Sequence, residues 1–436
     1  MTGALGQGAS GAAGATTGLC PVCLESIPAT LFASAGGVVL ESRCRDHGCF
    51  RDLVSPDPEL YREISSVPRK VGKPGAFQTQ ASRGCPDDCG LCPAHDQRTC
   101  LAILEVTERC ELGCPVCLAA SEPSGRDIGV LEAETALASV IRSNGHPSPL
   151  QLGGGEPTLH PRLIEIVAAA RSLGFSRIEL DTNGILLSEN AALCAVLSEA
   201  GLTGVYLQMD TLRSDSCVRI RGRDLIREKA AAIRNCAGAG LQVVLGVTVV
   251  PGVNDGELWE LVEFGVGAGL TGVNFQSLAL SGRFPPGRGA RFTLVHFLRE
   301  IERQSSGGLG VSDFNPIPCP DPRCGALAYA LVSGGRLIPA GRLIARDALL
   351  DHTAELRDWD HLLRDIDWKK AAAESCGCSQ PLDFFSVGFH GMMDARSFDA
   401  ERARRCCVHA LTWEGELVPF CLYNIKYRPR GGSRKP

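Results

Sequence analysis

The stretch at residues 101–117 reads LAILEVTERCELGCPVC, and it decides the fold. Its first seven residues, LAILEVT, have the apolar, partly β-branched character of a buried strand. Three cysteines, Cys110, Cys114 and Cys117, follow this strand in CxxxCxxC spacing. A second apolar strand, at 149–152, runs directly into GGGEPT. Because the carboxyl ends of parallel strands meet at one edge of a sheet, both motifs are expected on the same rim.

Strand and helix patterns alternate six times over residues 101–304. The expected strands are 101–107, 149–152, 177–181, 204–209, 242–250 and 271–276, and the expected helices are 130–143, 161–173, 189–200, 224–237, 255–268 and 293–304. Apolar strands that alternate with helices predict a parallel sheet covered by helices, and right-handed crossovers curl it toward a barrel. Six units are fewer than the eight of a closed barrel. The predicted fold is therefore α/β, an open partial (β/α)6 barrel with small cysteine-rich metal-binding units at both ends.

The composition points to metal chemistry. The chain has 436 residues, 44% of them hydrophobic, and a formal net charge of −5, which gives no argument for binding nucleic acid. We find neither an apolar run of the roughly 20 residues that span a bilayer nor the charged start of a secretory signal. We therefore expect a cytoplasmic protein without a transmembrane segment, for which membrane contact would be peripheral. In that reducing compartment, 21 cysteines at short spacings predict metal or iron–sulfur ligation.

The cysteines and the repeats divide the chain into five parts. We expect a flexible tail at 1–18, a small rubredoxin- or zinc-ribbon-like unit at 19–80 and an auxiliary cluster segment at 81–100. The barrel is expected at 101–305, followed by a region with a further auxiliary cluster at 306–436.

The loop with Cys110, Cys114 and Cys117 is predicted to hold a 4Fe–4S cluster. Three thiolates can ligate three irons and leave the fourth open for a cofactor. A zinc knuckle is the alternative by spacing alone. The position of the loop after the first strand, with GGEP after the second, favours the cluster. The glycines of GGEP would let a ligand approach the backbone, whose free groups can bind a charged amino acid moiety.

Three further groups of thiols are predicted to bind metal. A second CxxxCxxC motif with a nearby fourth thiol favours an auxiliary cluster over a structural zinc site, on Cys85, Cys89, Cys92 and Cys100. Two thiol pairs favour a mononuclear iron or zinc, on Cys20, Cys23, Cys44 and Cys49, with His47 as the alternative to Cys49. A predicted hairpin around residues 413–416 favours a second auxiliary cluster, on Cys319, Cys324, Cys406 and Cys421, with Cys407 as the alternate.

The remaining cysteines carry less information. Cys194, Cys217 and Cys236 stand alone in apolar helical contexts and are expected to be small buried hydrophobes. Cys376 and Cys378 are too close together for one unstrained tetrahedral site and are expected to be loop thiols, with a spare metal ligand as the alternative.

Residues 101–303, with CxxxCxxC and GGEP, resemble the radical S-adenosylmethionine (SAM) superfamily. Nearly the whole chain resembles its tetraether lipid synthase group, some of whose members carry an older pterin-methyltransferase label. The resemblance rests on CPxC, GCPxDCGLCxxH, TCLAILEVTxRCxxxCPVC, GGGEPT and a terminal RCC…PFCxYN, in that order. It implies that the Cys110 loop holds the SAM-binding cluster. It also implies SAM contacts by Gly154, Gly155, Glu156, Pro157, Gln208, Asp210, Thr248 and Asn254.

The resemblance also implies an oxygen-sensitive enzyme with a flavodoxin- or ferredoxin-type electron donor. It would cleave SAM reductively to a 5′-deoxyadenosyl radical and functionalise an unactivated C–H carbon by carbon–carbon bond formation on a lipid-like substrate. The alternatives are a radical C-methyltransferase of a pterin-like small molecule, a peptide-modifying enzyme with auxiliary clusters, and a non-enzymatic zinc or redox scaffold. No acid–base pair is required, and we expect no His/Asp/Glu constellation on the rim.

A lipid-like substrate implies a deep apolar channel to the rim. Its expected wall consists of residues around Phe275, Phe284, Phe384, Phe385, Phe389, Met392 and Met393. A cavity lined by arginines and carboxylates would instead favour a polar small molecule or a peptide.

Overall fold

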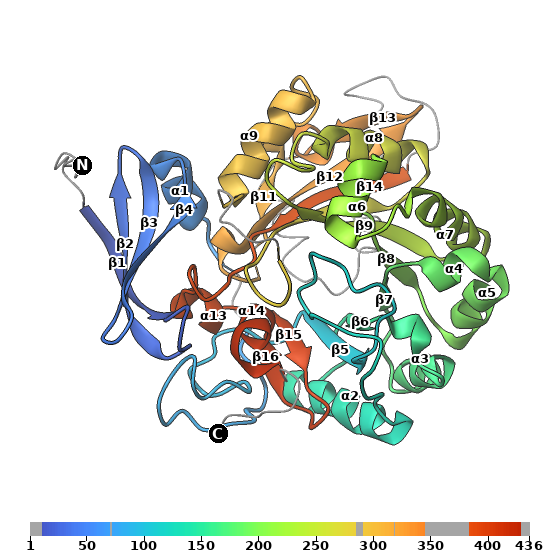
Figure 1. Ribbon diagram of the computed structural model, residues 1–436, viewed down its shortest axis with the longest axis horizontal. Coiled ribbons are helices and arrows are strands. Elements are labelled where there is room, and N and C mark those ends of the chain that lie inside the picture. Colours follow the sequence, from blue (N-terminus) through green and yellow to red (C-terminus); the bar gives the residue numbers. More distant parts are fainter. Residues whose placement is uncertain (1–10, 70–71, 285–290, 318, 345–382, 429–436) are drawn as a thin grey trace.

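The computed structural model describes residues 11–69, 72–284, 291–317, 319–344 and 383–428, which form two sheets. The smaller sheet has four antiparallel strands in chain order, β1 (Gly11–Leu19), β2 (Ser26–Ser34), β3 (Gly37–Cys44) and β4 (Gly48–Ser55). It lies to one side of the larger sheet, with helix α1 (Pro58–Ser65) beside it (Figure 1). The flexible tail expected at 1–18 is wrong for residues 11–18, which pair with β2 as an edge strand. The many glycines and alanines of this segment do not prevent it from forming a strand.

The larger sheet contains the predicted partial barrel. Its parallel strands follow one another in space as they do in the chain: β5 (Leu101–Thr107), β6 (Leu150–Gly154), β7 (Ile178–Thr182), β8 (Gly204–Gln208), β9 (Gln242–Val249) and β10 (Gly272–Ser277). Their outer faces pack under α2 (Val130–Asn144), α3 (Leu163–Ser172), α5 (Ala191–Ala200), α7 (Ile226–Gly238), α8 (Leu258–Gly267) and α9 (Leu294–Gln304). Figure 1 shows the strands as an arc with these helices outside it. The predicted α/β barrel is confirmed.

The C-terminal part of the chain extends this sheet at both edges. β14 (Asp383–His390) pairs in parallel with β10, and β15 (Val408–Leu411) pairs in parallel with β5. Beyond β14 lie the antiparallel strands β12 (Gly325–Ser333), β11 (Asn315–Pro316) and β13 (Arg336–Pro339). The predicted hairpin is β15 with β16 (Leu417–Pro419). Strands from the C-terminal part of the chain therefore contribute to the barrel wall. The six strand–helix units predicted from the sequence would have left both edges of the sheet unpaired.

Short helices that the sequence analysis did not predict follow two of the strands. These are α4 (Ile185–Glu189) after β7 and α6 (Ser214–Arg221) after β8.

The isolated cysteines Cys194, Cys217 and Cys236 are buried, as expected. Cys376 and Cys378 lie outside the described residues. Among the helices of the described residues, none is both long and apolar enough to cross a membrane.

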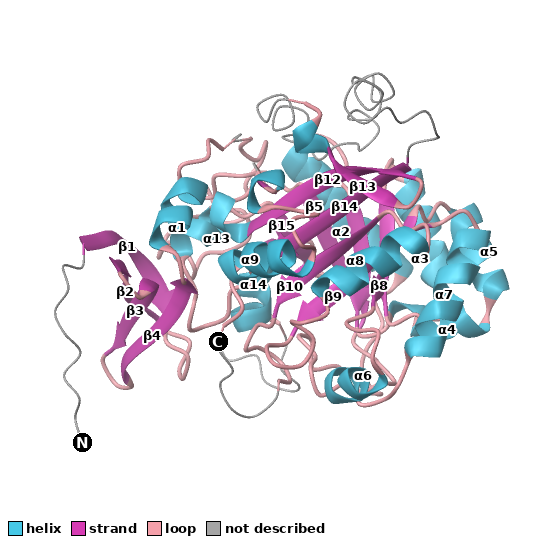
Figure 2. Ribbon diagram, turned by 90° about the horizontal axis from the view of Figure 1, so that it is seen from above, coloured by secondary structure: helices cyan, strands magenta, loops and turns pink. Residues whose placement is uncertain are grey.

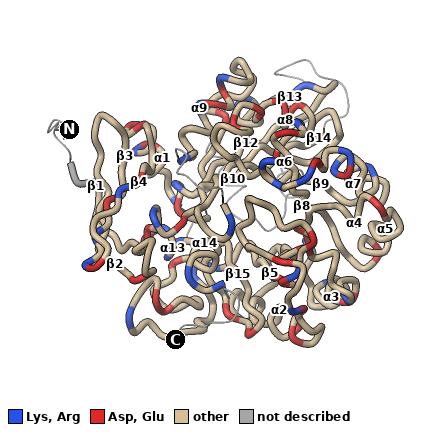
Figure 3. The backbone as a smooth tube through the Cα atoms, viewed as in Figure 1, with Lys and Arg blue, Asp and Glu red and all other residues tan. Residues whose placement is uncertain are grey.

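One buried arginine ties the small sheet to the barrel. The guanidinium of Arg291, which precedes α9, pairs with Asp52 on β4 at 2.5 Å and with Asp394 after β14 at 2.8 Å. Figure 2 shows the small sheet at one end of the molecule and the larger sheet between its helices. Charges of both signs are mixed over the face seen in Figure 3.

Candidate active site

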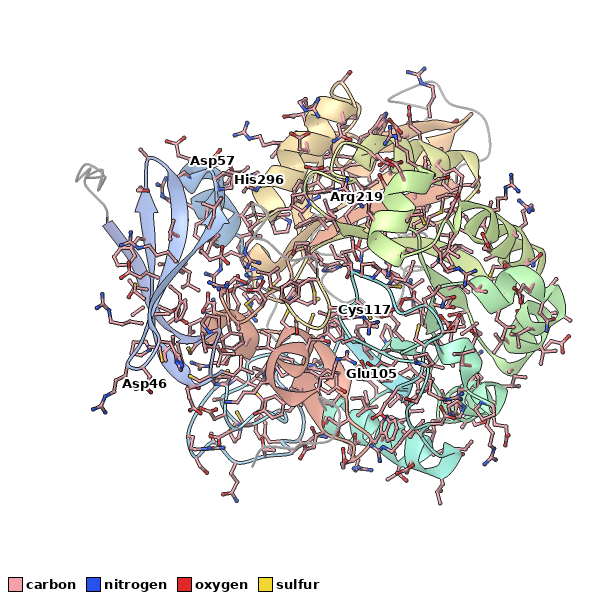
Figure 4. The ribbon with its side chains drawn as sticks, viewed as in Figure 1. Asp46, Asp57, Glu105, Cys117, Arg219 and His296 are labelled. Carbon is pink, nitrogen blue, oxygen red and sulfur yellow. The ribbon has the colours of Figure 1, made fainter. Side chains whose placement is uncertain are left out.

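One large cavity occupies the inside of the barrel. It has a volume of about 470 Å³, and all six strands from β5 to β10 contribute to its wall. In Figure 4, Cys117 and Glu105 lie near the centre of the molecule, within the arc of strands. Eight cysteines line the cavity: Cys100, Cys110, Cys114, Cys117, Cys324, Cys406, Cys407 and Cys421.

The CxxxCxxC loop is held in place from the opposite side of the barrel. Cys117 forms a two-way backbone bridge with Arg283, which follows β10. The side chain of Arg283 donates to the carbonyl oxygens of Cys114, Ala120 and Ser121 at 2.8–3.1 Å. These bonds fasten the backbone of the loop to the segment after β10.

Two thiols of this loop have raised pKa values and so favour the protonated form. Burial raises the pKa of Cys110 to about 12, and burial also raises the pKa of Cys114, opposed by the guanidinium of Arg221. Buried thiols of this kind become thiolates when a metal replaces their protons. The loop suits a tightly bound metal cluster better than a free nucleophile.

The GGEP segment fixes the geometry of the rim. A Cβ at Gly155 would overlap the carbonyl of Arg109, and one at Gly154 would overlap that of Thr107. These glycines therefore serve close backbone packing against the start of the cysteine loop, a reason the sequence analysis did not give.

Glu156 fastens β6 to β7 at the same rim. It is 1% exposed, and its carboxylate accepts hydrogen bonds from Thr158, from the Thr182 hydroxyl at 2.6 Å and from the Asn183 backbone at 2.7 Å. Burial raises its pKa despite these bonds. A contact between its carboxylate and the cofactor would have to share these oxygens.

The four polar residues expected to contact SAM from later strands separate into two pairs. Gln208 and Thr248 line the cavity. Asp210 and Asn254 are buried outside its lining: the Asn254 amide donates to the Asp210 carbonyl at 2.8 Å and holds the loop after β9. These two residues are better explained as supports of the rim than as cofactor contacts.

Arg221 is a cavity residue that the sequence analysis missed. It ends α6, pairs with Asp210 at 2.5 Å and donates to Gln208 at 3.0 Å. Its guanidinium also interacts with the thiol of Cys114. An unpredicted helix places it there, so no motif could have revealed it.

The inward face of the barrel carries polar side chains among apolar ones, whereas the expected wall was apolar. Lining side chains include Glu105, Gln151, Glu179, Asp181, Tyr206, Gln208, Asn274 and Gln276. Of the expected wall residues, only Met392 lines the cavity. Phe275, Phe385 and Phe389 lie on the outer face of their strands and pack in the core instead. Phe275 and Phe389 contact Phe297 of α9, and Phe385 lies against Gly265 of α8. Met393 is buried in another cluster, Phe384 packs against β12 and Phe284 is exposed.

The same wall corrects the expectation that no titratable constellation faces the rim. Glu105, Glu179, Asp181 and His390 all line the cavity. Burial raises the pKa of Asp181 to about 6 and lowers that of His390 to about 4. The signal was present in the sequence: in RIELD at 177–181 every second residue is polar, the spacing that puts side chains on one face of a strand.

The other thiols group differently from the prediction. Cys100 lies with Cys319 and Cys407, their sulfurs all within 4.8 Å of one another, and not with the motif at Cys85. The parallel pairing of β15 with β5 explains this, since it sets the Cys407 carbonyl 2.8 Å from the Cys100 amide. The neighbouring Cys85 thiol and burial raise the pKa of Cys89. The set of Cys85, Cys89 and Cys92 lies outside the cavity lining.

The remaining C-terminal thiols form a neighbouring group. Burial and the nearby thiols of Cys421 and Cys324 raise the pKa of Cys406. The Met393 amide donates to the Cys421 sulfur at 3.4 Å, and the guanidinium of Arg402 donates to the Cys324 sulfur at 3.4 Å. The set predicted for the second auxiliary cluster is therefore divided between two groups, because Cys319 joins Cys100.

The N-terminal tetrad contains His47 in place of the expected Cys49. Its ligand atoms belong to Cys20, Cys23, Cys44 and His47, and the imidazole Nδ1 lies 3.4 Å from the Cys44 sulfur. Cys49 is exposed at the start of β4. Three thiols and one imidazole are a typical zinc donor set.

Comparison with known proteins agrees with this geometry. The family model "Radical SAM superfamily" matches residues 104–265, and "HMPTM N-terminal zinc ribbon domain" matches residues 13–56. A Methanocaldococcus jannaschii protein named 7,8-dihydro-6-hydroxymethylpterin dimethyltransferase is 31% identical over 475 residues, covering 95% of this chain and 94% of its own. The chain belongs to the radical SAM superfamily. It is an enzyme of the group that resembles this pterin dimethyltransferase.

Other proteins match smaller parts of the chain. A probable GTP 3′,8-cyclase of Methanothermobacter thermautotrophicus is 31% identical over 163 residues, which cover 37% of this chain and 52% of that protein. The crystal structure of Streptococcus suis SuiB bound to S-adenosylmethionine is 14% identical, with a TM-score of 0.41, and covers 49% of this chain and 48% of its own. Membership implies a 4Fe–4S cluster and SAM, and the fixed, buried thiols of the Cys110 loop suit that cluster.

Proposed function

We propose that this radical SAM enzyme functionalises a C–H carbon of a compact polar molecule, by C-methylation of a pterin-like substrate. When bound, a reduced 4Fe–4S cluster would supply the electron that splits one SAM into methionine and a 5′-deoxyadenosyl radical, which would take a hydrogen atom from the substrate. The methyl group would come from a second SAM molecule, which leaves as S-adenosylhomocysteine, and the external reductant would supply both of the electrons that the overall reaction consumes. The name of the M. jannaschii relative agrees with this substrate class.

The polar side chains on the inner wall of the barrel carry this proposal. Asp181 accepts one hydrogen bond from the protein, so a hydrocarbon that excluded water would leave its other oxygen without a partner, a loss of about 1–3 kcal/mol. Glu179 and Asp181 on β7 and Asn274 on β10 face the same space. A molecule with its own hydrogen-bonding groups would satisfy them.

Several residues would prepare the site for its cofactor. Cys110, Cys114 and Cys117 would ligate the cluster, while Arg283 fixes their loop. Arg221 is a buried cation at the cavity wall beside Cys114, where a carboxylate such as that of SAM would find a charged donor. The enclosing barrel excludes water from the radical.

The remaining thiols would hold further metals. Cys100, Cys319 and Cys407 face the substrate cavity or adjoin it and would contribute to an auxiliary 4Fe–4S cluster, with a second on the neighbouring thiols. The N-terminal tetrad would hold zinc. A flavodoxin- or ferredoxin-type protein would supply electrons.

The proposal can be tested by anaerobic turnover. Reconstituted enzyme is incubated with SAM, dithionite and reduced 6-hydroxymethylpterin, and 5′-deoxyadenosine and methylated pterin are measured by mass spectrometry. We expect the pterin to accelerate deoxyadenosine formation and to gain methyl groups. Uncoupled SAM cleavage with unchanged pterin would contradict the proposed substrate class.

A second candidate is carbon–carbon bond formation on a lipid-like substrate. The observation that favours it is an apolar part of the wall around the cluster loop, formed by Leu112, Val116, Leu118, Leu278 and Ile317. A parallel incubation with total lipid extract distinguishes the two candidates, because mass-shifted lipids would appear only if this part of the wall binds hydrocarbon.

A further inference from the structure

Asp181 differs from the other carboxylates that line the cavity. Glu105 forms an ion pair with Arg428 and accepts a hydrogen bond from the Tyr423 hydroxyl. Glu179 forms an ion pair with Arg177 at 2.6 Å. Glu156 accepts its hydrogen bonds from rim residues such as Thr182. Within the described part of the chain, Asp181 receives one hydrogen bond, from the Gln208 amide to its Oδ1 at 2.8 Å.

Gln208 also fixes how Asp181 faces the cavity. Its Nε2 donates to Asp181 while its Oε1 accepts from Arg221 at 3.0 Å, so the amide cannot flip without losing both bonds. The Oδ2 of Asp181 remains for a ligand, next to Gly153, where a Cβ would lie 3.8 Å from it. Together with the second lone pair of Oδ1, this makes a two-point acceptor for a pair of N–H groups.

A hydroxyl donor stands beside this acceptor. Tyr206 on β8 is the register partner of Asp181 on β7, so their side chains emerge side by side on the cavity face. The Asn274 amide donates to the Tyr206 hydroxyl at 2.7 Å. That bond uses an acceptor position of the hydroxyl and leaves its proton to be donated to a ligand.

The geometry points to a subsite in which Asp181 and Tyr206 bind the edge of a 2-amino-4-oxopyrimidine ring. This edge presents two N–H donors, the amino group and N3–H, followed by the O4 acceptor. Asp181 would accept from the two donors and Tyr206 would donate to O4. Pterins and guanines share this edge, and the inference rests on the proposed function by naming what its substrate presents to the barrel.

The test compares two ligands that differ at one position. Pterin carries the 2-amino group, whereas lumazine carries an oxygen there and keeps N3–H and O4. Binding of both to the full-length, anaerobically reconstituted protein is measured by fluorescence titration. We expect the wild type to prefer pterin by about 10- to 100-fold.

Variants then assign the preference to its residues. Asp181→Asn keeps its Oδ1 bond to Gln208 and presents an amide N–H to the cavity, so it should reverse the preference in favour of lumazine. Tyr206→Phe should lower the affinity for both ligands equally, by about tenfold, because both carry O4. Glu105→Gln, at a carboxylate already paired with Arg428, is the matched control and should keep the wild-type preference.

Each outcome decides a different point. If the wild type prefers pterin and Asp181→Asn retains that preference, the subsite assignment is wrong while the proposed substrate class stands. If the wild type binds neither ligand and still cleaves SAM, both the subsite assignment and the proposed substrate class are wrong. Guanosine is the third probe: binding as tight as that of pterin supports the shared edge, and binding much tighter than that of pterin would identify a guanine as the natural source. Lumazine binding by Asp181→Asn also shows that this variant is folded.

Discussion

Cys100 and Cys110 lie at opposite ends of strand β5, and both line the same cavity. The seven residues between them in the strand span ~23 Å at about 3.3 Å per residue. One cysteine belongs to the predicted SAM cluster and the other to the group with Cys319 and Cys407. A substrate in the barrel would therefore face a metal centre at either end.

The first prediction concerns which CxxxCxxC motif cleaves SAM. Replacing Cys110, Cys114 or Cys117 with Ala should abolish formation of 5′-deoxyadenosine, because only this motif lines the cavity. Cys85→Ala, in the second motif, is the matched control and should retain cleavage. Equal loss in both would show that the two motifs have been assigned the wrong way round.

The N-terminal tetrad predicts which residue binds zinc. His47→Ala should lose the N-terminal zinc, measured by elemental analysis of the purified protein, because it removes one of four ligands. Cys49→Ala should keep a full complement, since that thiol is exposed outside the tetrad. The opposite pattern would restore the four-cysteine site expected from the sequence.

Arg402 predicts an effect on an auxiliary cluster. Its buried guanidinium donates to the Cys324 sulfur, and a cation at that position stabilises the more negative, reduced form. Arg402→Gln should lower the midpoint potential by on the order of 60 mV, a tenfold change for a one-electron couple. The potential is followed by EPR during redox titration. Arg404→Gln, at a half-exposed arginine paired with Glu401, should leave it unchanged.

Arg283 predicts the stability of the SAM-binding loop. Arg283→Ala removes three bonds to the loop carbonyls and should reduce the iron retained there during gel filtration. Arg219→Ala, on α6 in Figure 4, removes an arginine that does not line the cavity and should retain iron as the wild type does. Unchanged iron in Arg283→Ala would show that the thiols alone fix the loop.

The raised pKa of Asp181 predicts how pterin binding depends on pH. Burial and the nearby Glu179 and Glu105 raise this pKa to about 6, while Gln208 and Arg221 oppose the shift. Since two N–H donors need the ionised carboxylate, pterin affinity should be full above pH 6 and fall as the pH drops below it. His390 stays neutral across this range. Asp181→Asn should remove the pH dependence, and a persistent transition at pH 6 would implicate another group.

The sequence predicted the sheet well and its lining poorly. Strand-and-helix alternation specifies six parallel units, but it does not show that β14 and β15 flank them, because these pairings join residues more than a hundred positions apart. Those strand pairings also determine which thiols lie together. The sequence alone therefore places Cys100 with Cys85, although in the structure it lies with Cys319 and Cys407. The polar face could have been found from the alternation in RIELD at 177–181 and VNFQ at 273–276. It was overlooked because both faces of each strand were expected to be apolar.

The spacing of the metal ligands along the chain imposes an order on biosynthesis. The N-terminal tetrad is complete once residue 47 has left the ribosome, and its small sheet ends with β4 shortly afterwards. Cys100 must wait for Cys319 and Cys407, which arrive with the last strands of the barrel wall. Because domains fold as they emerge, zinc can enter the N-terminal site before Cys319 and Cys407, which complete the group with Cys100, have been synthesised. A cell short of iron but not of zinc would then accumulate a chain with a folded N-terminus and an open barrel, which is the form that quality-control proteases would meet.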